Sequence, residues 1–109
     1  MTVHVIDRYE VLMWSSRPMT PGAPVVGIWL YEPAEALGYA YLFLDGTQLQ
    51  PPVIDQGFIA LHYNLALFGP ILQILREESP VYLYEFGTSN AGLKTGTEPT
   101  GEEEEGLGG

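Results

Sequence analysis

Few residues in this chain have the types and spacing that catalysis requires. The stretch Gly87–Thr95 comes close to a phosphate-binding loop, but such a loop needs Gly directly before Lys, and Leu93 separates Gly92 from Lys94. The loop also needs a following helix whose N-terminus holds the phosphate, and residues 95–99 do not predict one. We therefore interpret this stretch as a polar linker.

The remaining polar residues show no catalytic or metal-binding pattern. His4 and His62 are the two histidines, and their spacing is not that of a zinc motif. Cysteine is absent, which excludes disulfides, thiol catalysis and thiolate-bound zinc. Asp45 and Asp55 fall in expected loops, where acids commonly make local hydrogen bonds. The sequence thus predicts no catalytic residue, no metal site, no cofactor and no enzymatic activity.

The C-terminal end of the chain suggests two alternative functions. A terminal Gly108-Gly109 is typical of ubiquitin-like modifiers, but this segment is rich in glycine, and the expected strand order differs from theirs. The net charge is −10, and an acidic tail on an acidic body indicates an inhibitor that imitates nucleic acid in a basic groove. The simpler interpretation is that the glutamates keep an aromatic-rich protein soluble. The acidic residues of this tail are Glu102, Glu103, Glu104 and Glu105.

Charge and hydropathy exclude two classes of partner. The four basic residues are scattered, so no basic track for nucleic acid is expected. No apolar run approaches the roughly 20 residues that a membrane-spanning helix needs. The first ten residues lack the apolar core of a signal peptide, so we expect a cytoplasmic protein.

The elements that carry these residues follow from periodicity and turn signals. Strands are expected at Val3–Trp14, Val25–Tyr31, Leu37–Leu44, Phe58–Tyr63 and Val81–Phe86, with one helix at about Leu67–Glu78. The order β-β-β-β-α-β predicts a two-layer α+β fold, in which one helix packs on an antiparallel sheet of four to five strands. We expect one domain over residues 1–87 and a disordered, acidic Gly/Glu-rich tail over residues 88–109.

The strands separate aliphatic from aromatic residues. Successive side chains alternate across a strand, so three strands each present one aliphatic and one aromatic side. The helix is expected to cover the aliphatic side, which leaves an aromatic surface as the candidate binding site. Its predicted residues are Trp29, Tyr31, Tyr39, Tyr41, Phe43, Tyr82, Tyr84 and Phe86.

Three covers for the aromatic surface remain open. Another part of the chain is the commonest cover in a small domain, a second copy would make a homodimer, and a partner protein is the third. Tyr and Trp are enriched at interfaces because they are apolar with a polar group attached. We expect a non-enzymatic interaction protein that acts through this surface, as a homodimer.

Overall fold

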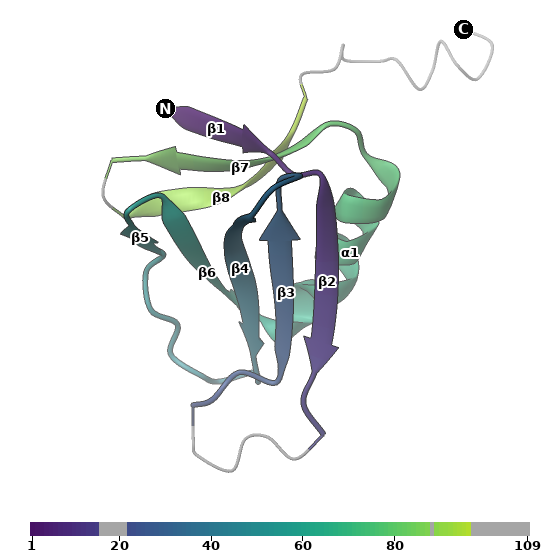
Figure 1. The fold of residues 1–109 in the computed structure, drawn as a ribbon. Helices are drawn as coiled ribbons and strands as arrows, with labels where there is room; N and C mark the ends of the chain where they lie inside the picture. The colour runs from purple at the N-terminus through teal and green to yellow at the C-terminus, as the bar shows by residue number, and fades with distance from the viewer. Residues whose placement is uncertain (16–21, 88, 97–109) are drawn as a thin grey trace, which may run out of the picture.

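A computed structural model describes residues 1–15, 22–87 and 89–96 of the chain (Figure 1). The described residues form eight strands, one 3₁₀ turn and one α-helix. The first four strands are β1 (Thr2–Val5), β2 (Arg8–Met13), β3 (Val26–Tyr31) and β4 (Ala36–Phe43). They are followed by β5 (Val53–Asp55), β6 (Phe58–Asn64), η1 (Leu65–Leu67), α1 (Phe68–Glu77), β7 (Val81–Phe86) and β8 (Asn90–Thr95).

The strands form two sheets that share one core. The larger sheet has the order β2-β3-β4-β6-β5, and the smaller has the order β1-β7-β8. In Figure 1 the smaller sheet lies across one end of the larger sheet, and α1 lies behind β2 and β3. The expected α+β class with a single helix is therefore confirmed. The sheet itself differs from the expectation, because it is divided in two and because β4 and β6 pair in parallel.

The expected first strand, Val3–Trp14, is in fact two strands in different sheets. Val3 and its neighbours pair with β7, whereas the residues from Arg8 onward pair with β3. The chain passes from the smaller sheet to the larger within two residues. The Ile6 N–H donates to the Val81 carbonyl at 2.9 Å, and the Asp7 N–H donates to the Tyr31 carbonyl at 2.7 Å. This crossover ties the two sheets together near their common edge.

Two strands were not expected from the sequence. Val53–Asp55 pairs with β6 at one edge of the larger sheet, in a stretch that was expected to be irregular. Asn90–Thr95 pairs with β7, so the expected polar linker and the tail boundary at residue 88 are wrong over this segment. Gly92 lies beneath the Tyr84 ring, whose atoms would come within 3.0 Å of an added Cβ, and packing of this kind compensates for a weak strand former. The acidic residues and terminal glycines of the tail lie outside the described residues.

The core forms where the aliphatic sides of both sheets meet the helix. Ile28, Leu30, Leu42, Ile59 and Leu83 are fully buried in one cluster. The helix contributes Ile71 to this cluster, with Leu72 and Leu75 packed against it. The predicted aliphatic side of the central strands is therefore the core side.

Two residues, Asn64 and Pro70, set the start of the helix. The Asn64 side chain accepts a hydrogen bond from the Ala66 N–H at 2.8 Å, which caps the 3₁₀ turn. Pro70 then falls in the first turn of α1, where its missing N–H costs no helical hydrogen bond.

The central strand β4 depends on close backbone contact at Gly38. A Cβ built on Gly38 would lie 2.0 Å from the backbone carbonyl oxygen of Ile59 in β6. Because the obstacle is backbone, no rotation of a side chain relieves the clash. Only glycine lets β4 approach β6 closely enough to pair with it from Gly38 to Phe43.

Substitution at Gly38 tests this packing. We expect Gly38→Ala to lower the free energy of unfolding by about 3 kcal/mol, as overpacking of a core backbone contact does. The matched control is Gly69→Ala, because an added Cβ there meets no atom within 4 Å and alanine favours the helix. Urea unfolding curves measure both changes, and similar midpoints for the two variants would contradict the account.

Candidate binding surface

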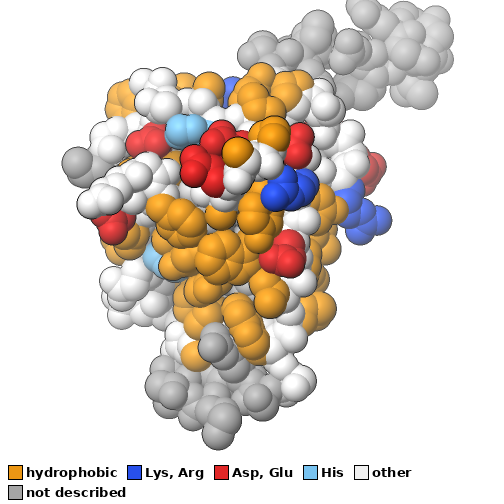
Figure 2. Space-filling view, in the orientation of Figure 1, with side chains coloured by type: hydrophobic (Ala, Val, Ile, Leu, Met, Phe, Trp, Pro, Cys, Tyr) orange, Lys and Arg blue, Asp and Glu red, His pale blue; other side chains and the backbone are white. Residues whose placement is uncertain are grey.

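The side of the larger sheet that faces away from α1 carries a continuous group of aromatic rings, which we call the aromatic face. Five predicted residues share this face because they alternate with core residues along β3 and β4. Two further rings, Trp14 and Phe58, join them. The aromatic face comprises Trp14, Trp29, Tyr31, Tyr39, Tyr41, Phe43 and Phe58, and Figure 2 shows hydrophobic side chains gathered in this region.

Ring contacts join the aromatic face both within β4 and across neighbouring strands. Tyr39 and Tyr41 stack with ring centroids 3.9 Å apart and planes 24° apart. Trp29 lies 5.3 Å from Tyr39 and 6.0 Å from Phe58, measured between centroids. Such contacts favour tilted and edge-on geometry and fix each ring against its neighbour. The result is a rigid surface that loses little side-chain entropy when a partner covers it.

Trp14 extends the face because glycine leaves room for it. Its indole lies over Gly27, where a Cβ would come within 2.9 Å of the ring, and it meets Tyr41 edge-on at 5.7 Å. The Trp14 N–H donates to the Val25 carbonyl at 3.1 Å, so the β2–β3 ladder extends one residue beyond β2 and turns the ring onto this face. The signal in the sequence was the alternation along β2. Trp14 lies an even number of residues after Arg8 and Glu10, whose partners Tyr31 and Trp29 are on this face.

Three predicted site residues lie elsewhere. Tyr82, Tyr84 and Phe86 belong to β7, which pairs with β1 and β8 in the smaller sheet. The expectation that all eight aromatic residues share one surface is therefore wrong for these three. The cause is the crossover at Ile6 and Asp7, which assigns β7 to the second sheet and which alternation within a strand does not reveal.

One end of the aromatic face carries a small charged network around Tyr31. The Tyr31 hydroxyl donates to the Glu10 carboxylate at 3.0 Å, and the Arg8 guanidinium lies 4.6 Å from the centre of the Tyr31 ring. The hydrogen bond to Glu10 raises the pKa of Tyr31 above its ordinary value of 10.0, and Arg8 opposes the change. The network holds both charges in defined positions beside β2.

The two histidines have structural partners. His4 forms a 3.0 Å contact with the Glu85 carboxylate on the core-facing side of the smaller sheet. His62 Nδ1 lies 3.1 Å from the Gln50 carbonyl oxygen and holds the loop before β5 against β6. Asp45 accepts a 3.2 Å hydrogen bond from the Asn64 side chain, which lies 19 residues further along the chain, so this bond joins the turn after β4 to the end of β6 rather than being the local bond expected of a turn acid. Within the described residues, no group of three or more histidine or acidic side chains is arranged to hold a metal ion.

Comparison with known proteins gives no further indication of function, and neither does a search of the described helices for a membrane-spanning one. Comparisons of the chain with protein-family models, with curated proteins and with solved structures found no match. Among the described helices, none is long and apolar enough to cross a membrane. The function must be inferred from the aromatic face and its surroundings.

The Tyr31 network gives a test of the geometry at this end of the face. We expect Glu10→Gln to lower the pKa of Tyr31 toward 10.0, because it removes the anionic acceptor that favours the protonated phenol. The raised pKa stabilises the fold below about pH 10, and that contribution is lost as the pH rises. NMR titration of the Tyr31 ring carbon measures the pKa.

Glu35→Gln is the matched control, since it removes the same charge from the turn after β3 without touching the hydroxyl. A Tyr31 pKa that responds equally to both substitutions would show that the 3.0 Å hydrogen bond does not set it.

Proposed function

We propose that this chain is a non-enzymatic interaction domain that binds a partner protein through the aromatic face. The observation that carries the proposal is the contact of rings across β3, β4 and β6 on the side of the sheet away from α1. Every ring of the aromatic face is only partly buried. A rigid apolar surface of this kind offers a partner buried area at a low entropic cost.

The size of the aromatic face fits an interaction site. An aromatic side chain buries about 150–250 Å² when fully covered, so seven partly exposed rings leave several hundred Å² of apolar surface. The largest apolar patch on a typical monomer is about 300–600 Å² and is often functional. A standard interface takes about 800 Å² from each partner, so the rim around the rings must also take part.

The rim of the aromatic face is acidic. Glu10 lies at the β2 side and Asp55 opposes Phe58 at the β5 side. Three further acids lie at the ends of the central strands: Glu32, Glu35 and Asp45. Among the described residues of this rim, Arg8 is the one Lys or Arg, and its guanidinium already lies on Tyr31 and donates to the Glu32 carbonyl oxygen.

This arrangement of charge favours one kind of occupant. A protein surface with an aliphatic centre and a border of Lys or Arg would match both the rings and the acids, and its cations gain further from contact with Trp and Tyr faces. A second copy placed face to face would instead oppose acid to acid. We therefore assign the aromatic face to a basic, apolar partner, and a dimer contact must lie elsewhere on the chain.

The proposal is tested with designed peptides of the stated chemistry. A short amphipathic helix of Leu and Lys should bind the chain with an affinity that falls as salt is added, because its cations meet the acidic rim. We expect Tyr39→Ala to weaken this binding about tenfold, as loss of a central aromatic contact does. Tryptophan fluorescence follows the titration.

Two controls separate binding to the aromatic face from nonspecific binding of the peptide to exposed apolar residues. The same helix made with Glu in place of Lys should not bind, and Phe86→Ala removes an aromatic ring that is 57% exposed in the smaller sheet. Equal binding of both peptides, or an equal loss in Tyr39→Ala and Phe86→Ala, would overturn the proposal.

A further inference from the structure

The strand β2 is a free edge of the larger sheet. Within the described part of the chain it pairs only with β3, and three consecutive apolar residues on it are exposed: Val11 by 36%, Leu12 by 37% and Met13 by 68%. Proteins usually protect an edge with charged side chains (lysine above all), proline, a bulge or a very short strand. The opposite edge, β5, is only three residues long, whereas β2 has six residues and contains neither lysine nor proline.

The backbone of β2 has a defined set of groups directed away from the sheet. The Trp14 N–H donates to Val25, the residue directly before β3, and N–H groups alternate in direction along an antiparallel strand. The even-numbered residues therefore face β3. The N–H and C=O groups of Tyr9, Val11 and Met13 point to the free edge, where they can pair with another strand.

The side chains of β2 select one register for a second copy of the same strand. With Tyr9 opposite Tyr9 of the second copy, Arg8 of each copy lies opposite Glu10 of the other, in the closer, non-hydrogen-bonded type of pair. A shift of one step opposes Glu10 to Glu10, and a further step opposes Glu10 to Leu12. The first register alone forms two opposite-charge pairs, with residues that Tyr31 already holds in place.

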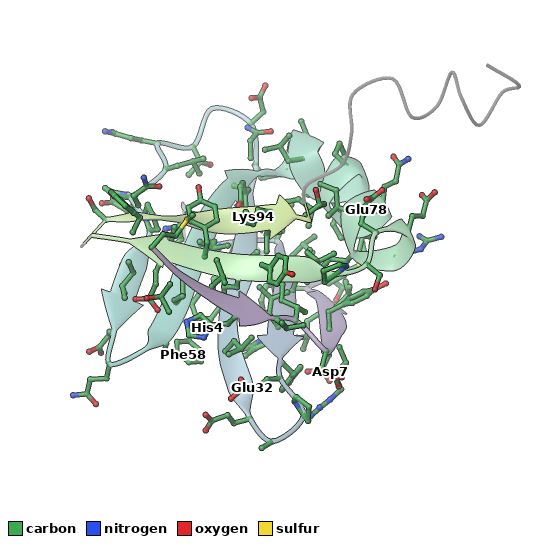
Figure 3. All side chains as sticks on the ribbon, turned by 90° about the horizontal axis from the view of Figure 1, so that it is seen from above. His4, Asp7, Glu32, Phe58, Glu78 and Lys94 are labelled. Carbon is green, nitrogen blue, oxygen red and sulfur yellow. The ribbon has the colours of Figure 1, made fainter. Side chains whose placement is uncertain are left out.

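A cavity at the same edge fits this arrangement. It has a volume of about 570 Å³ and lies between the turn that joins β1 to β2 and the end of α1. Its lining includes Tyr9 and Leu75. It also includes Asp7 and Glu78, and Figure 3 shows these two acids on the same side of the molecule. In the chosen register the second copy's Val11 lies opposite Asp7, and its Met13 continues toward this cavity on the α1 side of the sheet.

We propose that two copies of this chain join through their β2 edges, with Tyr9 opposite Tyr9, to form one ten-stranded sheet. The two-fold axis stands perpendicular to the sheet, so the aromatic faces of both copies lie on the same side and form one extended surface. The interface is the backbone pairing of Tyr9 with Tyr9, a bond from each Val11 N–H to the Asp7 carbonyl of the other copy, the two Arg8–Glu10 pairs, and the apolar contact of Met13 with the cavity. The Asp7 N–H takes no part, because it already donates to the Tyr31 carbonyl.

The backbone part of the interface is tested at Val11. Val11→Pro removes one outward N–H without removing a hydrogen bond to β3, so we expect the dimer to dissociate at least tenfold more readily in sedimentation equilibrium. The matched variant Val11→Thr keeps the N–H and a β-branched side chain and should stay dimeric. A wild-type chain that is monomeric at all concentrations, or a Val11→Pro chain that dimerises as well as wild type, would overturn the proposal.

The register is tested by exchange of charges. Arg8→Glu and Glu10→Arg each oppose like charges and should weaken the dimer about tenfold. The double variant Arg8→Glu/Glu10→Arg restores both pairs and should recover the dimer, and failure to recover would refute the register. Val11 belongs to the proposed dimer contact and not to the aromatic face. Val11→Pro monomers should therefore still bind the Leu/Lys helix, which separates this proposal from that for the aromatic face.

Discussion

One helix can cover only one side of the larger sheet, and the rest of the structure depends on this limit. Five strands span about 20 Å across the sheet, while a ten-residue helix is about 15 Å long and about 10 Å wide. The helix and the smaller sheet enclose the aliphatic side around Ile28, Leu42 and Leu83. The other side is left to aromatic residues, which tolerate partial exposure because Tyr and Trp carry polar atoms.

Glycine and the strand alternation then shape that exposed side. Gly38 brings β4 against β6, and Gly27 makes the space that Trp14 fills, so rings from separate strands reach one another. The stacking of Tyr39 on Tyr41 and the contacts of Trp29 with Phe58 make the surface rigid. The same packing that completes the fold thus prepares a surface for a partner, while the acids of the rim determine which partner fits.

The sequence predicted the parts of the structure that depend on local rules. Alternation along β3 and β4 placed Trp29 and Tyr39 together, because the period of two is a property of any strand. The apolar period likewise placed the single helix at about Leu67–Glu78, within one residue of its observed bounds. The sequence did not predict which sheet β7 joins, since that depends on the two-residue crossover after β1, nor the strand at Asn90–Thr95, which is stabilised by pairing with β7 rather than by its own composition.

The central claim is that the aromatic face is open in the free chain, and its two tryptophans report on it directly. Trp14 and Trp29 are the only tryptophans of the sequence and both lie on this face. The decisive measurement is acrylamide quenching of tryptophan fluorescence, first in the free chain and then with the Leu/Lys helix bound. The account predicts ready quenching in the free chain and protection in the complex; tryptophans already shielded in the free chain would contradict it.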